Sequence, residues 1–563
     1  MIIGSDVQEI IPFLYMKNLR VFLILITYIS CTGKKTDFSR IANTHSEIKV
    51  KILNDKELDK WYYKDIQQDT LPGISLIRAF QELDLPKKNH EVIIAVLDNP
   101  IDIHHPAISQ HLWINKNEIP KNGIDDDNNG YLDDYKGWNF LGNKNGDVAL
   151  FQSGEHVRII NKYSNAFRGK NADSILPKDH LNYQEYLRAL KAYSADSITT
   201  TKEKHYVAAI KKILDETTGG TRPYFPDEEY TLEVLDSLAM IHLRDTTLIK
   251  QKFLQNNIVK YENNALFISN LCWQEENRFD YVLNLNFDER AVQGDNGYDI
   301  EDKFYGNNNV NWSLDKLTHG TRVASVSVFN ALDEFSSRSN LKIMPVVIAS
   351  FGENHSKDIA LAIRYAVDNG ANVISMGFIK NFSVDSKWLA DALIYAEENN
   401  VLVIKAAGNN NDNTDSIDFV DFPTDTNILG KEFVSNFIVV GASTYHLDSH
   451  LKANFSNYGK TNIDVFAPGQ DIYTAYPNAG FKLDGGTAIA SAITAATAGL
   501  LFSYYPKLTA AQVKKILIDS GVSYTIPVSI GEGEKLCPFN QLSKSGKIIN
   551  AYNALLMAEE ITK

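Results

Sequence analysis

The sequence predicts an α/β fold, in which a doubly wound, mostly parallel sheet has helices on both faces and a large, mainly helical insertion interrupts the domain. Residues 91–98 form an apolar run that ends in a carboxylate, as a buried strand of a parallel sheet often does. Strand-like and helix-like segments alternate between residues 341 and 406. Helical spacing of apolar residues runs from Tyr183 to Leu214, with Lys and Glu between them.

The alternating region sets the order of the sheet elements. Right-handed crossovers are expected to connect its parallel strands through helices on the two faces. The expected strands are 341–348, 373–378 and 401–406, and the expected helices are 358–369 and 386–399. Outside this region, helices are expected at 74–83, at 230–241 and at 510–518, the last capped by Thr509.

Composition narrows the class of protein. The chain has 563 residues, 44% of them apolar, which is enough to bury one large core or two domains. Its 56 basic and 70 acidic residues give a net charge of −14, which argues against nucleic acid as a partner. The three cysteines, Cys31, Cys272 and Cys537, are too few for a disulfide framework, although a Cys272–Cys537 pair stays open.

The N-terminus has the pattern of a targeting segment. A basic stretch at 16–20 precedes an apolar run at 21–29 that is too short to span a bilayer. Ser30-Cys31 then follows, and a small residue before a cysteine resembles the bacterial lipobox, which implies lipid attachment at Cys31. The sequence therefore predicts an exported protein of the cell envelope that contacts the membrane only through this lipid. A plain signal peptide and a secreted protein are the alternative.

A glycine-rich turn near the end of the chain opens a long apolar segment. Residues 484–491 read Asp-Gly-Gly-Thr-Ala-Ile-Ala-Ser, and small apolar residues continue to Leu501, as in a tight turn that leads into a buried helix. Hydrolases often place a nucleophile at such a helix start, because the unpaired N–H groups there stabilise negative charge. The stretch resembles the nucleophile block of the subtilisin-like serine peptidases (subtilases), with Ala488 at the position of the serine.

Three more blocks resemble the same family, in the family's order. Asp98 precedes a His-Pro pair, His319 lies in a His-Gly-Thr block, and Asn409 ends Ala-Ala-Gly-Asn. The resemblance covers residues 85–140 and 300–525. It implies that Asp98 orients the imidazole, that His319 is the general base, and that Asn409 donates a hydrogen bond to an oxyanion.

The resemblance also identifies a substrate-binding strand, formed by Ser375, Met376 and Gly377. Ile379 stands where the family has a glycine beside the specificity pocket, so its side chain is expected to occupy substrate space. The family pattern is also broken at Asn99, Pro100, Arg322, Ile489 and Ala492. Changes at so many positions favour natural loss of the nucleophile over a single engineered replacement.

One acidic loop has the pattern of a calcium site. Asp125, Asp127 and Asn129 occupy alternate positions before a glycine, and Asp133 follows, as at the start of an EF-hand loop. The twelfth position is Lys136, where a bidentate glutamate is expected, so a solvated acidic turn is the alternative. The expected chemistry requires no cofactor, and calcium is a candidate ion.

These patterns divide the chain into five parts: a targeting segment (1–31), an N-terminal linker or segment (32–85), the first part of a subtilase-like domain (86–147), a helical insertion (148–297), and the second part of the domain with a C-terminal tail (298–563). Two functions stay open. One is a catalytically impaired homologue that binds a polypeptide or protein partner in the cell envelope. The other is an active, secreted serine endopeptidase with an atypical nucleophile, although Ser491 lies nearly one helical turn beyond Ala488 and is expected to be too distant.

Overall fold

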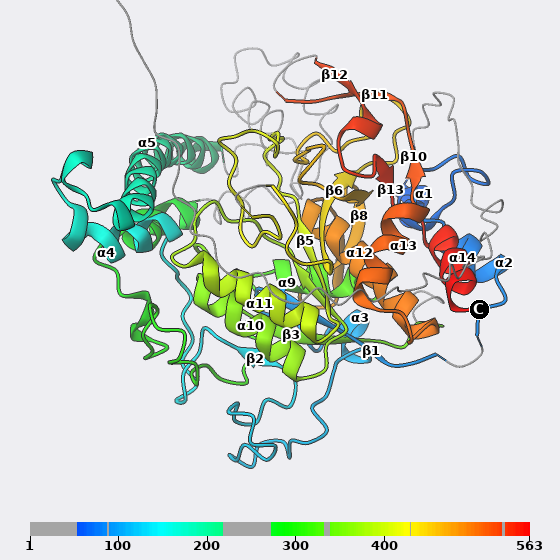
Figure 1. Ribbon diagram of the computed structural model, residues 1–563, viewed down its shortest axis with the longest axis horizontal. Helices are drawn as coiled ribbons and strands as arrows, with labels where there is room; N and C mark the ends of the chain where they lie inside the picture. Colours follow the sequence, from blue (N-terminus) through cyan, green and yellow to red (C-terminus); the bar gives the residue numbers. More distant parts are fainter. Residues whose placement is uncertain are drawn as a thin grey trace, which may run out of the picture. The chain divides into compact units, whose positions relative to one another are not determined.

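The computed structural model describes residue 53 and residues 55–86, 89–217, 272–330, 338–427, 430–531 and 535–563. The targeting segment, with Cys31, and the helix expected at 230–241 lie outside these residues. Within them, a nine-stranded sheet is covered by helices on both faces (Figure 1). The predicted α/β fold with a mostly parallel sheet is therefore confirmed.

The sheet has the strand order β10-β13-β7-β6-β5-β4-β1-β3-β2, and all neighbours are parallel except β10 and β13. β1 lies between β3 and β4, so the chain crosses to opposite sides of β1 and the strand order changes direction there. In open parallel sheets, ligands bind at the carboxyl ends of the strands next to such a change of direction. The strands are β1 (Val92–Asp98), β2 (Trp138–Asn139), β3 (Leu341–Val347), β4 (Val373–Met376), β5 (Leu402–Ala406), β6 (Phe437–Ser443), β7 (Val465–Pro468), β10 (Val522–Ser523) and β13 (Lys547–Ile548). Two hairpins lie outside the sheet: β8 (Ile472–Tyr476) with β9 (Gly480–Asp484), and β11 (Pro527–Ser529) with β12 (Leu536–Pro538).

Each face of the sheet has its own apolar core. Along β1, Ile94 and Val96 point into one core, and Ala95 and Leu97 point into the other. The first core takes in α9 (His319–Val326), α12 (Thr487–Tyr504), α13 (Ala510–Ser520) and α14 (Ala551–Thr562), and the second takes in α10 (Ser356–Asp368) and α11 (Ser386–Glu398). In the described part of the chain, α12 alone is long and apolar enough to cross a membrane, but it is entirely buried as the central helix of the first core.

The elements expected from the sequence appear close to their expected bounds. Strands β3, β4 and β5 and helices α10 and α11 differ from the predicted ranges by at most two residues at either end. Thr509 caps α13 as predicted: its hydroxyl accepts from Gln512 N, and the Gln512 side chain accepts from Thr509 N. The expected helix at 74–83 is α2 (Leu76–Glu82).

The N-terminal part packs into the main core instead of running over its surface. It contains α1 (Asp55–Leu58), a short 3₁₀ turn at Trp61–Tyr63, and α2. All three aromatic residues of the turn are fully buried, and Trp61 Nε1 donates to Asp471 O at 2.9 Å. Residues 55–86 are therefore part of the folded domain.

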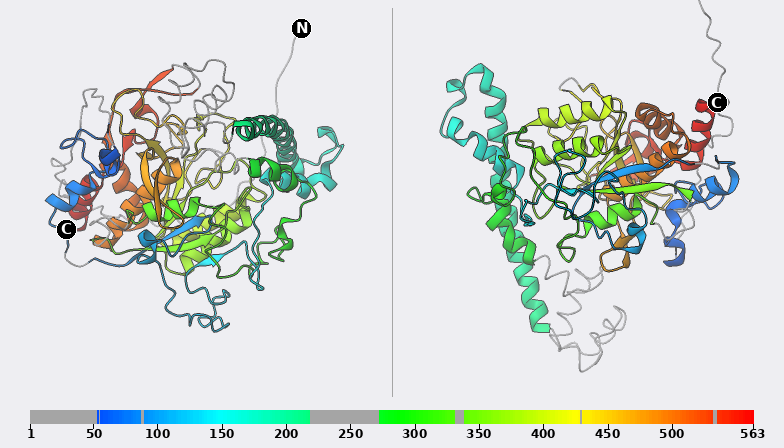
Figure 2. Two further views of the ribbon diagram at one scale, coloured as in Figure 1. Left: turned by 180° about the vertical axis from the view of Figure 1, so that it is seen from behind. Right: turned by 90° about the horizontal axis from the view of Figure 1, so that it is seen from below.

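The insertion begins with two helices, α4 (Glu155–Phe167) and α5 (His180–Thr217). The predicted helix at 183–214 lies within α5, which is about 57 Å long at 1.5 Å per residue and runs along one side of the domain (Figure 2). Apolar side chains of α4 and α5 share a core with Phe382 and Val384, which follow β4. The insertion is thereby attached next to the carboxyl end of β4.

The remaining short helices are α3 (Pro106–Ser109), a π turn at Arg278–Val282, and 3₁₀ turns at Ala172–Ser174, Pro177–Asp179, Glu289–Ala291 and Phe539–Gln541. Cys272 and Cys537 are not bonded to each other, so the expectation that they could form a disulfide is wrong.

Candidate active site

Asp98 and His319 meet at the carboxyl end of β1. Asp98 is the last residue of β1 and is buried, and His319 is the first residue of α9 with a third of its side chain exposed. His319 Nδ1 lies 2.7 Å from Asp98 Oδ1, so Nδ1–H donates to the carboxylate and Nε2 is the ring nitrogen left to exchange a proton with a ligand. Such a pair holds the imidazole in the tautomer that a general base requires.

Two contacts press α9 against the end of β1. A Cβ atom on Gly320 would lie 2.2 Å from Asn99 O, so only glycine permits this approach. Thr321 Oγ1 accepts a hydrogen bond from Asp102 N at 2.9 Å. The glycine and the threonine of the His-Gly-Thr block therefore set the distance between His319 and Asp98.

Ala488, near the start of α12, completes this arrangement. A Cβ atom built on Gly377 would lie 2.9 Å from Asp98 Oδ2, 3.0 Å from His319 Cε1 and 3.1 Å from Ala488 Cβ. The three positions that the sequence assigned to the catalytic constellation thus surround a single point at the end of β4.

Asn409, beyond the end of β5, is oriented by its neighbour at the start of α12. Its Oδ1 accepts from both the backbone N and the Oγ1 of Thr487, each at 2.9 Å. Since a backbone N–H can only donate, this contact fixes which amide atom is the oxygen. A Cβ atom on Gly486 would lie 3.5 Å from Asn409 Nδ2 and 3.9 Å from Ala488 N. The two nitrogen atoms therefore lie near one position, and two N–H donors directed at such a position would stabilise an oxyanion.

The nucleophile position has no heteroatom. Ala488 offers only a methyl group, and the hydroxyl of Ser491 donates to Ala488 O at 2.8 Å from a fully buried side chain. The hydroxyl of Ser491 therefore serves the helix backbone. His319 could act as a base and the N–H groups of Asn409 and Ala488 could polarise a bound carbonyl group, but residues 488 and 491 present no oxygen to attack that carbonyl.

Of the three residues assigned to the substrate-binding strand, Gly377 alone lines the cavity of this site. The side chains of Ser375 and Met376 are fully buried in β4. The cavity wall instead continues to Phe378 and Ile379. Ile379 Cδ1 lies 2.8 Å from the position of a Cβ on Gly408, so the isoleucine reaches across to the loop after β5, as expected from its bulk.

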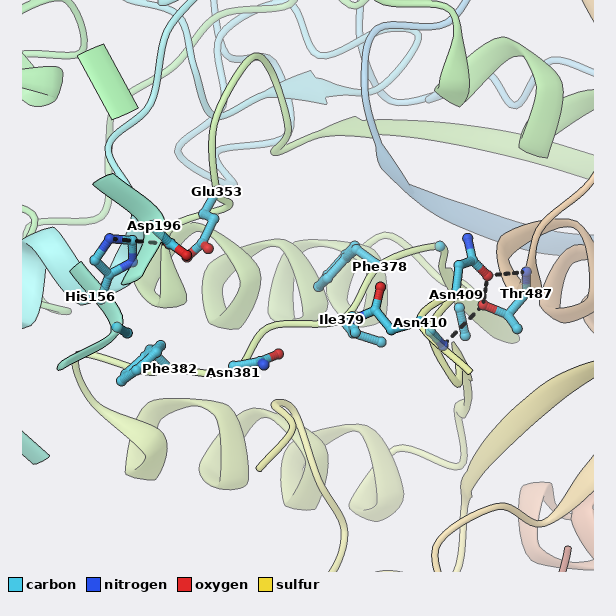
Figure 3. Close-up of a pocket in the computed structure, with 14 residues that line it drawn as sticks. His156, Asp196, Glu353, Phe378, Ile379, Asn381, Phe382, Asn409, Asn410 and Thr487 are labelled. Carbon is cyan, nitrogen blue, oxygen red and sulfur yellow. Dashed lines mark hydrogen bonds and ion pairs between the residues drawn. The ribbon is translucent and has the colours of Figure 1, made fainter. Parts of the chain in front are cut away.

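The cavity has a volume of about 440 Å³ and extends from the oxyanion donors to the insertion. Asn409 and Thr487 lie at one end, and His156, Asp196 and Glu353 lie at the other (Figure 3). Sequence reasoning missed this second end. Glu353 could have been suspected, because it closely follows β3 at the carboxyl edge of the sheet, but nothing in the sequence of α4 or α5 marks His156 or Asp196.

The acidic loop brings together only part of the predicted calcium set. Carboxylate oxygens of Asp125 and Asp127 lie within 4.8 Å of each other and of Glu118, which the sequence did not suggest. Among the described residues, Glu118 Oε2 is buried without a hydrogen-bond partner, and burial raises the pKa of this carboxyl group. Three oxygen donors at this spacing fit a hard divalent cation such as calcium.

The other two predicted ligands, Asp133 and Asn129, form hydrogen bonds within the same loop. The Asp133 carboxylate accepts from Asn122 N and Gly123 N, at 3.2 and 2.9 Å. Asn129 donates through Nδ2 to Asp134, and its Oδ1 accepts from Tyr131 N. These contacts brace the loop around the three grouped carboxylates.

Comparison with known proteins agrees with this geometry. Residues 89–533 match the Subtilase family. A cell wall-associated protease of Bacillus subtilis (strain 168) is 34% identical over 223 residues, which are 39% of this chain and 22% of that protein. Subtilisin DY of Bacillus licheniformis is 28% identical over 226 residues, which are 39% of this chain and 77% of that protein. The crystal structure of a lanthipeptide protease is 25% identical and covers 42% of this chain and 75% of its own, with a TM-score of 0.34.

The aligned part spans about a fifth of the length of the Bacillus subtilis relative. The family match itself covers well over half of the chain and includes all four blocks, from Asp98 to Ala488. With those blocks gathered at one edge of a parallel sheet, we conclude that the chain belongs to the Subtilase family.

Proposed function

We propose that this protein is an exported subtilase homologue that holds extended polypeptide in its cleft without hydrolysing it. The observation that carries the proposal is the alanine at position 488, beside an otherwise ordered set of groups. Removal of the serine from a subtilisin lowers turnover by about 2 × 10⁶, so a methyl group here is expected to leave negligible hydrolysis.

Binding is supported by the groups that remain. Asn409 Nδ2 and Ala488 N lie near one position where a carbonyl oxygen could be held, and Asn409 also lines a cavity of about 440 Å³. Two of the relatives are named as a protease and a subtilisin, which makes polypeptide the natural class of ligand. Binding of a polypeptide does not require a nucleophile, because the nucleophile acts only when the peptide bond is attacked.

Export is supported by the predicted targeting segment and by the relative that is named cell wall-associated. With lipid on Cys31, the protein would stay at the cell envelope and present its cleft to polypeptides there. The active endopeptidase is the competing function. The hydrogen bond from Ser491 to Ala488 O weighs against it, because Ser491 would have to break that bond and leave the core.

The test measures binding and hydrolysis on the same purified chain. We expect fluorescein-labelled denatured casein to bind saturably without release of fragments, and a serine-reactive fluorophosphonate to leave the protein unlabelled. Asn409→Ala should weaken casein binding by about tenfold, since it removes a hydrogen-bond donor. Asn145→Ala, on an exposed loop, should bind as the unmodified chain does. Stoichiometric labelling that is lost in His319→Ala would overturn the proposal and favour an active peptidase.

A further inference from the structure

The end of the cavity far from Asn409 is formed partly by the insertion (Figure 3). His156 comes from α4, Asp196 from α5, and Glu353 from the loop after β3. The His156 side chain is 3% exposed, and its Nε2 lies 3.6 Å from Asp196 Oδ2 without a hydrogen-bond partner among the described residues. The Asp196 side chain is 40% exposed, and Glu353 accepts from Glu155 N at 2.7 Å.

The buried charges behind this wall neutralise one another. Arg158 pairs with Glu155 at 2.5 Å and with Glu289 at 2.6 Å, and Lys380 pairs with Glu155 at 2.9 Å. Burial alone would raise the pKa of Glu155, but Lys380 and Arg158 lower it to about 2, so this carboxylate stays ionised. Two cations thus balance two carboxylates. Asp196 and Glu353 are the carboxylates that line the cavity in the described part of the chain, and neither forms an ion pair with a lysine or arginine within 4 Å there.

Nearby cations offset these two carboxylates only in part, because Lys380, which attracts Glu353, is already paired with Glu155 at 2.9 Å. Arg188 lies over the Phe382 ring but is held by Glu185, with Nη2 2.6 Å from Oε1. Burial lowers the pKa of His156. Glu353 and Asp196 act in the opposite direction, but Arg158 and Arg278 add to the effect of burial, and the pKa stays below its usual value. The imidazole is therefore neutral near pH 7 and adds no positive charge.

We propose that this acidic end of the cavity selects a cationic side chain, lysine or arginine, of the bound polypeptide. The inference rests on the proposed function, since it assumes that polypeptide occupies the cleft. Phe378 and Ile379 line the cavity between Asn409 and the acidic end (Figure 3). A polypeptide held at Asn409 can thus continue along this wall and place a long side chain at the acidic end. Its aliphatic stem packs on Phe378 and Phe382, and its charged head reaches Asp196 and Glu353.

The test uses two fluorescein-labelled, N-acetylated peptides of one sequence, which differ at a single position that holds lysine or norleucine. Norleucine keeps the four-carbon stem and lacks the ammonium group. Fluorescence anisotropy with the unmodified full chain should show about tenfold tighter binding of the lysine peptide, with the difference shrinking as salt rises. Asp196→Asn and Glu353→Gln should each reduce that difference, and both side chains keep an acceptor oxygen. Asp173→Asn, an exposed acid of the same insertion, is the matched control and should keep it.

The outcomes separate the two proposals. Equal affinity for both peptides, unchanged in Asp196→Asn and Glu353→Gln, overturns the selectivity and leaves peptide binding standing. Absence of binding for either peptide overturns the proposed function and the selectivity with it. Thermal melting of each variant against the unmodified chain identifies loss of folding, and a variant that melts early is replaced by Asp196→Ser or Glu353→Ala.

Discussion

Arg322 of α9 and Asp484 of β9 form an ion pair, with Nη1 2.6 Å from Oδ2. Arg322 lies one helical turn after His319, and Asp484 lies four residues before Ala488. The pair therefore connects the helix that carries the base to the segment that leads into the nucleophile position. The Arg322 guanidinium also lies 5.5 Å from the centre of the Tyr476 ring. The arginine that departs from the family pattern thus has its partners within the same chain.

Breaking this pair should destabilise the fold. The two side chains are only 19% and 14% exposed, so Arg322→Met leaves a largely buried carboxylate without its partner. We expect a loss of about 2–3 kcal/mol in the free energy of unfolding, measured by urea denaturation. Lys515→Met, which removes an exposed pair with Asp519, should cost under about 1 kcal/mol. Losses in Arg322→Met and Asp484→Asn that simply add in the double variant would show that the two residues are not coupled.

A second stability prediction concerns Asp425, a buried acid in the segment between β5 and β6. Burial and the nearby Asp464 raise the pKa of Asp425 to about 6 from its usual 3.8, although Lys514 lies 3.8 Å away. Since the folded-state pKa lies above the unfolded value, the folded chain binds the extra proton between pH 3.8 and 6, and stability falls as pH rises through that window. At pH 7 the ionised carboxylate is therefore destabilising.

Asp425→Asn should consequently raise the free energy of unfolding at pH 7, by on the order of 2 kcal/mol. The gain should disappear near pH 4, where the native carboxyl group is already protonated. Urea titrations of both proteins at the two pH values measure this. An equal gain at pH 4 and pH 7 would mean that the substitution acts through packing and not through the charge.

The course of the polypeptide was more predictable than its side-chain contacts. Strands β3 and β5 are buried almost throughout, so they read as largely apolar runs, each with a single lysine, and their limits are visible in the sequence. His319 and Asn409 were found because short blocks around them resemble a family, since no local pattern could join residues so far apart in the chain. Asp196 was not predictable, because α5 is 38 residues long and its sequence does not say which polar side chain faces the core.

Calcium should stabilise the chain through the acidic loop. We propose that Glu118, Asp125 and Asp127 bind the ion, so millimolar calcium should raise the melting temperature as ligand binding to the folded state requires. The rise should be absent in Asp127→Asn and in Glu118→Gln. It should persist in Asp173→Asn, whose carboxylate is exposed on another element. A melting temperature that is identical with calcium and with a chelator would contradict the site.

The lipid prediction concerns Cys31, which lies outside the described residues. If the cysteine carries lipid, the mature protein should partition into the detergent phase when a detergent extract of expressing bacteria is phase-separated. Cys31→Ser should move it to the aqueous phase, whereas Cys537→Ser should leave the partition unchanged. Recovery of the unmodified protein wholly in the aqueous phase would favour the plain signal peptide.

Restoring the nucleophile tests how much of the catalytic geometry remains. Ala488→Ser adds a hydroxyl to a Cβ atom that lies near His319, since both are about 3 Å from the position of a Cβ built on Gly377. Asp98 already contacts His319, and Asn409 is already oriented by Thr487. Ile379 still reaches across the cavity to the loop after β5, and a displacement of substrate by 1 Å can cost on the order of 10²-fold in rate.

We therefore expect Ala488→Ser to give weak or no hydrolysis of denatured casein. Addition of Ile379→Gly should raise the rate by about tenfold, because the glycine reopens space for the substrate. His319→Ala in the double variant should abolish that activity, since it removes the base that takes the proton from the serine. Full activity in Ala488→Ser alone would show that only the nucleophile had been lost, and that Ile379 does not obstruct the substrate.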